Sequence, residues 1–258
     1  MAKKSKKNAA YKLLILFGAL IIITTVSWFG YRGWLYYKAK FRKYPEFGID
    51  IPENYSIHGI DVSKYQSIIA WEEVQKMQVK DVKLGFAFIK ATEGVRNIDP
   101  LFRRNWKKSK QAGIIRGAYH FFVATKDGRL QAENFINMVD LESGDLPPVL
   151  DVEQTNGVSK EVLRKEVKKW LDTIGDNYGV KPIIYTNVDF YNQYLGGTDF
   201  DNYPLWVAHY YQEYKPRISR DWIFWQHSEE GRVNGILSRV DFNVFSGDSL
   251  EFRNILIN

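Results

Sequence analysis

Two carboxylates stand one residue apart at the end of an apolar run. Asp151 and Glu153 follow the segment LPPVL at 146–150. Side chains alternate along a strand, so residues two apart point to the same side with Cα atoms about 6.5–7 Å apart. Like charges at that range resist ionising together, and one proton is retained to higher pH. We expect Glu153 to keep this proton as a general acid, and Asp151 to stay ionised and stabilise developing positive charge.

Further polar and aromatic residues end other apolar runs. Asp61 and Asp241 are the remaining acids at such positions. Carboxylate clusters without metal-binding histidine spacing, in a chain with 16% aromatic residues, fit glycoside hydrolysis, whose transition state resembles an oxocarbenium ion. Aromatic faces offer stacking platforms for sugar rings. The expected substrate-binding residues are Tyr119, Tyr185, Trp206, Gln226, Lys90 and Glu93.

Eight apolar runs are expected to be the strands that position these residues, at 57–62, 85–90, 117–122, 148–152, 182–186, 205–209, 222–227 and 240–244. Eight strands close a parallel α/β barrel, which carries its chemistry at the C-terminal strand ends. Helical patterns lie between several runs, the best at 159–179 and shorter ones at 68–78, 101–112 and 130–141. The connections 187–204 and 210–221 are too irregular for full helices. The sequence therefore predicts an α/β fold, a TIM-like (β/α) barrel of eight strands with an incomplete helical ring.

Seven short motifs follow one another along this region: GIDVSKYQ (59–66), FIKATEG (88–94), DPLF (99–102), GAYHF (117–121), DVE (151–153), WQH (225–227) and VDFN (240–243). Together they resemble glycoside hydrolase family 25, the Chalaropsis-type lysozymes, which are N-acetylmuramidases of bacterial peptidoglycan. The resemblance covers about 57–246. It implies an incomplete β/α barrel with Glu153 as acid/base, Asp151 assisting, and Asp61 and Asp241 completing the acidic site. Tyr65 stands where many members have Trp, a departure expected to affect packing more than chemistry.

The net charge of +6 is concentrated near the N-terminus. Residues 1–31 hold five lysines and no acid, and residues 32–48 hold five bases (Arg32, Lys38, Lys40, Arg42 and Lys43) against one acid. Residues 49–258 carry 26 bases and 29 acids, a net charge of −3. A nucleic-acid partner is therefore not expected. The absence of cysteine excludes a disulfide framework, a thiol nucleophile and Cys-ligated metal sites.

An uncharged stretch of nineteen residues, 13–31, separates the two basic clusters. A helix of this length rises about 28 Å, close to the hydrocarbon thickness of a bilayer. No A-x-A-like cleavage site follows, and aromatic residues suited to the headgroup layer gather at the far end: Trp28, Tyr31, Trp34, Tyr36 and Tyr37. We therefore expect an uncleaved transmembrane anchor rather than a signal peptide.

Counting basic residues does not orient this span, because five flank each end. The family resemblance does, since peptidoglycan lies outside the cytoplasmic membrane. The expected organisation is a basic tail (1–12) inside, a single-pass anchor (13–31), a juxtamembrane linker (32–56) and a glycoside hydrolase barrel (57–258) outside the cytoplasm. Peptidoglycan strands and the membrane are the expected partners.

Other functions are weaker hypotheses. An inactive sugar-binding barrel would be expected to have lost one of the four acids, but all four are present. No feature of the sequence favours a membrane scaffold that uses the domain only for protein contacts. A chitinase-like barrel requires a D-x-x-D-x-D-x-E run that 146–153 lacks. A metal hydrolase would have to use His120, His209 and His227, but no two-His-one-carboxylate or H-E-x-x-H spacing supports it. We expect neither a metal nor a cofactor.

Overall fold

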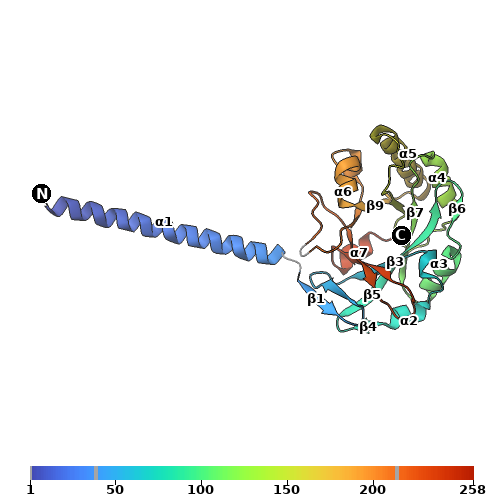
Figure 1. Cartoon of the computed structure of the whole chain (residues 1–258), viewed down its shortest axis with the longest axis horizontal. Coiled ribbons are helices and arrows are strands. Elements are labelled where there is room, and N and C mark those ends of the chain that lie inside the picture. Colours follow the sequence, from blue (N-terminus) through green and yellow to red (C-terminus); the bar gives the residue numbers. More distant parts are fainter. Residues whose placement is uncertain (1, 38–39, 213–214) are drawn as a thin grey trace. The chain divides into compact units, whose positions relative to one another are not determined.

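The computed structural model describes residues 2–37, 40–212 and 215–258, which divide into two compact units (Figure 1). Helix α1 (Ala2–Tyr37) makes up most of the first unit, and the second contains 41–212 and 216–258. Lys38 lies outside the described residues. So do the side chains of Tyr36, Tyr37 and the four lysines within 1–11.

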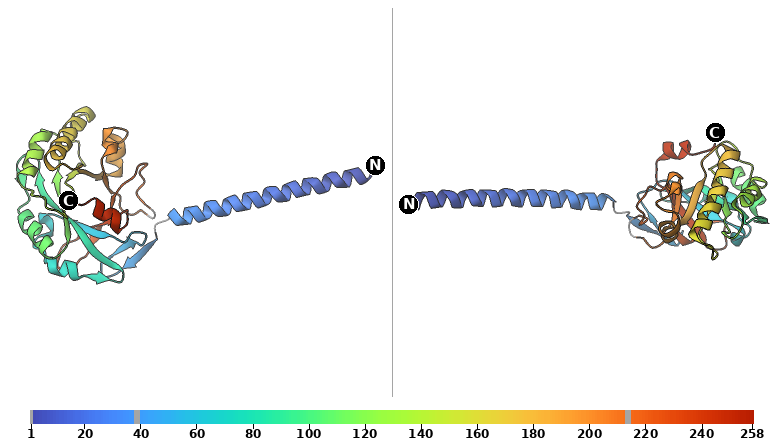
Figure 2. Two further views of the ribbon diagram at one scale, coloured as in Figure 1. Left: turned by 180° about the vertical axis from the view of Figure 1, so that it is seen from behind. Right: turned by 90° about the horizontal axis from the view of Figure 1, so that it is seen from above.

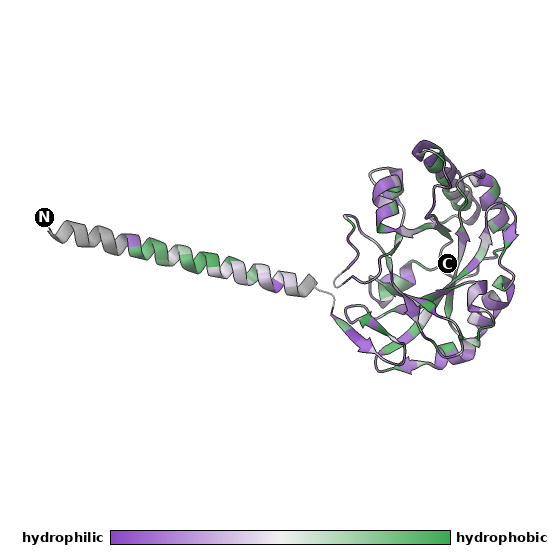
Figure 3. Cartoon of the chain, in the orientation of Figure 1, coloured by the Kyte–Doolittle hydropathy of each residue, from purple (hydrophilic) through white to green (hydrophobic). Residues whose placement is uncertain are grey.

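Helix α1 is apolar along its middle (Figure 3). The segment Lys12–Trp34 has a mean hydropathy of 2.3, and among the described residues none of its most apolar stretch is buried. Near its end the Arg32 guanidinium lies 5.4 Å from the centroid of the Trp28 ring, and the Tyr31 and Trp34 rings stack at 5.8 Å. The expected N-terminal apolar helix is thus present, with a length and composition that suit a signal sequence or a membrane anchor.

An antiparallel hairpin begins the second unit. It consists of β1 (Phe41–Tyr44) and β2 (Ile49–Pro52). Tyr44 and Ile51 are buried in the main core, the Phe47 ring lies 5.3 Å from that of Phe242, and the Tyr44 hydroxyl donates to Asp81 Oδ1 at 2.9 Å. The segment expected as a linker, 32–56, is therefore folded against the barrel from residue 41 onward.

Eight strands pair in a closed ring. Around the ring they are β3 (His58–Val62), β12 (Val240–Phe245), β11 (Phe224–Gly231), β10 (Leu205–Ala208), β9 (Ile183–Asn187), β8 (Val149–Asp151), β7 (Ile115–Phe121) and β5 (Val82–Glu93). Two short strands, β4 (Gln78–Val79) and β6 (Asn97–Ile98), pair with β5 outside the ring. Each of the eight expected apolar runs overlaps one ring strand, so the predicted barrel is present.

The ring is mixed, and the expectation of a purely parallel barrel is wrong. Strand β12 runs antiparallel to both of its neighbours, β11 and β3. The sequence pattern could not show this, because a buried strand has the same apolar composition in either direction. The reversal brings the beginning of β12 to the rim where the other strands end.

Helices surround part of the barrel (Figures 1 and 2). The longest is α5 (Lys160–Tyr178), which begins where Ser159 Oγ accepts from the backbone N–H of Val162 and ends at Gly179, whose φ is +69°. The others before it are α2 (Trp71–Lys76), α3 (Phe102–Gln111) and α4 (Gly128–Ile136). Between β9 and β10 come only short helical turns, α6 (Val188–Phe190), η2 (Tyr191–Leu195) and η3 (Asp199–Asn202). The described residues between β10 and β11 contain no helix, so the helical ring is incomplete as expected.

Aromatic rings fill the barrel interior. Phe88 stacks on Trp206 with centroids 4.3 Å apart, and Phe86 and Phe224 pack beside them. Phe252 of α7 (Ser249–Asn254) lies against Phe86 and Phe224 and closes the end of the barrel away from the acids. The acids on the opposite rim therefore stand above a floor of packed aromatic rings.

Glycine makes room for these rings. A Cβ added at Gly59 would lie 2.5 Å from two ring carbons of Phe86. Gly59→Ala should therefore lower the free energy of unfolding by about 1–3 kcal/mol, the usual cost of overpacking a core. Chemical denaturation measures this change. Gly85→Ala is the matched control, since its Cβ would meet only an ordinary contact at 3.8 Å. Equal stability of the two variants would contradict this account.

Candidate active site

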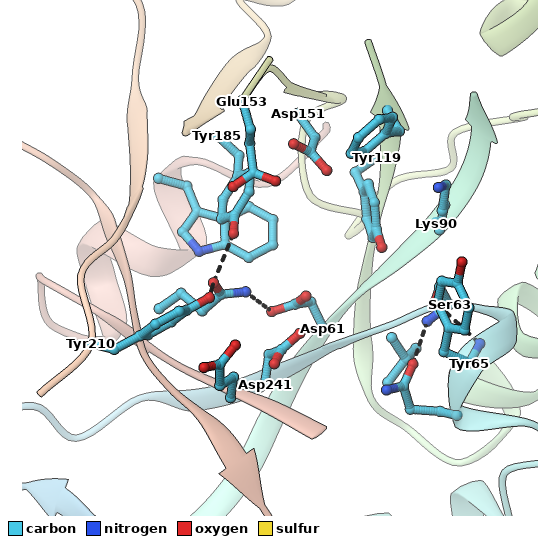
Figure 4. Close-up of a pocket in the computed structure, with 16 residues that line it drawn as sticks. Asp61, Ser63, Tyr65, Lys90, Tyr119, Asp151, Glu153, Tyr185, Tyr210 and Asp241 are labelled. Carbon is cyan, nitrogen blue, oxygen red and sulfur yellow. Dashed lines mark hydrogen bonds between the residues drawn. The ribbon is translucent and has the colours of Figure 1, made fainter. Parts of the chain in front are cut away.

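A cleft of about 460 Å³ opens at the rim where the acids stand (Figure 4). It is lined by all four predicted acids and by five of the six predicted substrate-binding residues, Glu93 being the exception. Glu93 instead forms a 2.6 Å ion pair with Lys90. The lining residues that sequence analysis did not assign to the site are Val62, Ser63, Tyr65, Gln66, Phe121, Tyr210 and Glu229.

Asp61 and Asp241 face one another across the β3–β12 pairing, where they are direct partners in the register. Closure of the ring between its first and last strands therefore brings these two acids together. Asp241 was expected at the end of a parallel strand, but it stands at the beginning of an antiparallel one. Asp241 still lies at the expected rim, because the beginning of an antiparallel strand is at the same edge of the barrel as the ends of the parallel strands.

A hydrogen-bond network holds Asp61. Its Oδ2 accepts from Gln226 Nε2 and Asn243 Nδ2, both at 2.7 Å. Gln226 Oε1 in turn accepts from the hydroxyls of Tyr185 at 2.7 Å and Tyr210 at 2.5 Å. These donors fix the amide so that its N–H faces the carboxylate. Asn243 was not predicted as a site residue, although it ends the VDFN motif.

Asp61 and Asp241 have different pKa values, although burial raises both. Desolvation raises the pKa of Asp61 to about 6, with its amide donors opposing the shift. Desolvation and the adjacent Asp61 charge raise the pKa of Asp241 to about 9. At neutral pH, Asp61 therefore carries the charge and Asp241 the proton, as expected when like charges share a site.

The pKa values of both carboxyls of the Asp151–Glu153 pair are also raised. Asp151 is 6% exposed, and its Oδ1 accepts no hydrogen bond from a described residue. Desolvation first and then the Glu153 charge raise the pKa of Asp151 well above its ordinary value, whereas Lys90 opposes the shift. Glu153, half-buried beyond the end of β8, also has a raised pKa, mainly from desolvation. The pair thus favours retention of a proton, as expected for two carboxyls in a desolvated cleft.

The predicted aromatic platforms differ in accessibility. Trp206 and Tyr185 are only 2% and 7% exposed and form the floor of the cleft. Trp206 stacks on Phe88, and its Nε1 donates to Asn243 Oδ1 at 2.8 Å. Tyr65, whose identity was expected to concern packing, is 74% exposed and lines the cleft.

The histidines lie outside the cleft lining. His120 is fully buried and its Nδ1 is 2.7 Å from Thr92 Oγ1, while His227 is buried between Trp225 and Phe242. Desolvation lowers the pKa of both imidazoles to about 3, so they are neutral at physiological pH. The backbone N–H of Arg217 donates to His209 Nδ1. The three histidines therefore have different surroundings in the fold.

A barrel of eight strands with paired carboxylates in a rim cleft defines the class of α/β-barrel glycoside hydrolases. The chain belongs to glycoside hydrolase family 25, whose model, Glycosyl hydrolases family 25, matches residues 60–236. It is 48% identical over 207 residues to YegX of Escherichia coli K12, described as an uncharacterized protein, covering 80% of this chain and 76% of that protein. It is 34% identical over 207 residues to Lysozyme M1 of Streptomyces globisporus, covering 75% and 69% of the two chains. A family 25 glycosyl hydrolase from Bacillus anthracis superposes with a TM-score of 0.74 at 32% identity, covering 84% of this chain and all of that one.

The raised pKa of Asp241 leads to a prediction about stability. Its pKa rises from the ordinary 3.8 to about 9 in the folded protein. Between these values folding requires proton uptake, so the free energy of unfolding falls as pH rises. Asp241→Asn removes this cost. The variant should be more stable than the parent, with a gain that grows from pH 5 to pH 9 in thermal or chemical unfolding.

Asp50→Asn, at an exposed position of β2, is the control for loss of one carboxylate. It should show no comparable gain. A gain for Asp241→Asn that did not change with pH would contradict the assigned protonation.

Proposed function

We propose that this protein is a muramidase that hydrolyses the β-1,4 bond between N-acetylmuramic acid and N-acetylglucosamine in peptidoglycan. The observation that carries the proposal is the gathering of Glu153, Asp151, Asp61 and Asp241 in one cleft. Family membership supports it, because relatives such as Lysozyme M1 are named for this activity.

Glu153 is proposed as the general acid that protonates the leaving glycosidic oxygen. Its raised pKa favours the protonated form needed for this step. Its position beyond β8, half-exposed in the cleft, lets it reach a bound substrate. After the leaving sugar departs, the resulting carboxylate activates water for the second half of the reaction.

Asp151 is proposed to orient the 2-acetamido group of the substrate. Its buried Oδ1 has no partner among the described residues, and the acetamido N–H is a donor of the required kind. A hydrogen bond to the charged form lowers a carboxyl pKa. Substrate binding would therefore release the proton from Asp151 and leave it ionised against the positive charge that develops at the anomeric carbon. We favour this assistance by the acetamido group over a covalent glycosyl-enzyme.

Asp61 and Asp241 are proposed to set the electrostatic field of the cleft. Asp61, held by Gln226 and Asn243, supplies a fixed negative charge near the site of oxocarbenium character. Asp241, in its protonated form, can donate a hydrogen bond to the glycan. Both residues are part of the proposed catalytic machinery.

Glu153→Gln tests the assignment. The change keeps the size of the side chain and removes the proton donor, so release of glycan fragments should fall by about 10²–10⁴-fold. Full-length protein in detergent micelles is incubated with purified peptidoglycan, and the new reducing ends are identified by mass spectrometry. N-acetylmuramic acid is expected at those ends. Glu133→Gln, at a residue of α4 that does not line the cleft, should leave the rate unchanged.

N-acetylglucosamine at the new reducing ends would refute the proposed bond specificity. Binding of glycan by the unaltered protein without any release would indicate an inactive sugar-binding barrel instead. Proton NMR of the first anomer formed gives a further test of the mechanism. Retention of configuration is expected from acetamido assistance, and an inverted product would rule it out.

We propose further that 13–31 is a single-pass anchor holding the barrel outside the cytoplasm. Support comes from the apolar surface of Lys12–Trp34, exposed on all sides, and from the aromatic residues near its end. A peptidoglycan substrate would require this orientation.

The proposed membrane anchor can be tested separately. The protein should remain in the membrane fraction after a carbonate wash, because a span of this length is held by its buried apolar surface. Added protease should digest the barrel in spheroplasts, whereas a cytoplasmic control protein stays intact. A soluble form whose N-terminus lies near residue 30 would instead show that the segment is a cleaved signal.

A further inference from the structure

Two segments far apart in the sequence form one ledge beside the cleft. They are 64–70 and 235–239, and we refer to them together as the mouth ledge. Gln66 Nε2 donates to the Arg239 carbonyl at 3.0 Å, and the backbone N–H of Ala70 donates to the Gly235 carbonyl at 2.9 Å. Ser238 Oγ lies within hydrogen-bond distance of the Tyr65 carbonyl. These contacts give the ledge a fixed shape.

The backbone at Tyr65 is fixed from its other side as well. Ser63 and Gln66 form a reciprocal capping box around this turn. Asp99 Oδ2 accepts from the backbone N–H of Lys64 at 2.8 Å. The turn thus keeps one conformation although it lies at the surface, so that little ordering entropy is lost when a ligand binds.

The side chains of the mouth ledge are unusually exposed for apolar groups. Tyr65 is 74%, Ile68 56% and Leu237 97% exposed. Tyr65 also lines the cleft, and in Figure 4 it lies on the opposite side of the acids from Tyr210. A rigid backbone that holds an exposed ring at one end of a sugar cleft provides a stacking surface without rearrangement.

Positive charge accompanies this ring. Lys64 Nζ lies 5.5 Å from the Tyr65 ring centroid and forms no ion pair with any residue in the described ranges. Two other bases lie near this end: Lys90, which lines the cleft, is paired with Glu93, and Arg239 of the ledge is paired with Glu230 at 3.4 Å. The opposite end has Tyr210 with the acidic Glu229. The free cation is therefore found beside Tyr65.

We propose that Tyr65 and Lys64 form an outer subsite for an acidic sugar, beyond the two sugars that flank the scissile bond. Tyr65 stacks on the pyranose ring, and Lys64 pairs with a carboxylate that this sugar carries. The inference rests on the proposed function, in which the carboxylate is that of an N-acetylmuramic acid residue that carries no peptide. It makes recognition depend on chain length and on the charge of the glycan.

Binding to full-length Glu153→Gln protein in detergent micelles tests the subsite without cleavage. Calorimetry measures the affinity for peptide-free peptidoglycan strands, and for the same strands with their carboxylates converted to amides. Adding Tyr65→Ala should weaken both by about tenfold, whereas Tyr65→Trp should preserve both. Adding Lys64→Glu should weaken only the acidic strands, by several-fold, as expected for an exposed ion pair.

Two variants control for general effects. Lys107→Glu makes the same charge change on α3, and Leu250→Ala removes an exposed apolar side chain on α7, both outside the cleft lining. Neither should alter affinity, and all variants should share one thermal midpoint. Affinity within twofold of the Glu153→Gln parent after Tyr65→Ala would overturn the subsite alone. Failure of the parent to bind any glycan would overturn the proposed function and the subsite with it.

Discussion

The pairing of β12 with β3 is the constraint on which the rest of the site depends. It closes the barrel, and its register places Asp61 opposite Asp241. The same strand brings Asn243 to Asp61 on the adjacent residue pair of this face. A slip of one residue would turn these side chains to the other face of the sheet. The strand pairing that closes the barrel therefore also assembles the site.

Concentrating carboxylates in a desolvated cleft opposes folding, and the barrel offsets this cost in two ways. Amide donors from Gln226 and Asn243 stabilise one charge, on Asp61, while proton retention removes another from Asp241. The aromatic floor beneath, with Trp206 stacked on Phe88, supplies apolar burial and fixes Asn243 through the indole N–H. The residues that stabilise the core thus also orient the groups that hold the site.

Sequence patterns were sufficient for the strands, the capped helix α5 and the acids, since each depends on local composition or on a motif. They did not reveal the direction of β12 or the folding of 41–52 against the barrel, because both depend on pairing with distant segments. The protonation of Asp151 was also beyond reach, since it follows from its 6% exposure rather than from its spacing to Glu153. Tyr65 could be aligned with a family position, but its exposure is set by contacts with 235–239.

The placement of the proton between Asp151 and Glu153 can depend on the bound substrate. With protein groups alone, desolvation favours a proton on Asp151. A ligand that donates a hydrogen bond to the unpartnered Oδ1 favours the charged form of Asp151, and the adjacent charge then favours proton retention by Glu153. A 2-acetamido sugar meets this requirement and a sugar with a 2-hydroxyl meets it less well, because the amide N–H cannot rotate away from the carboxylate. Proton placement would thus contribute to specificity as well as to rate.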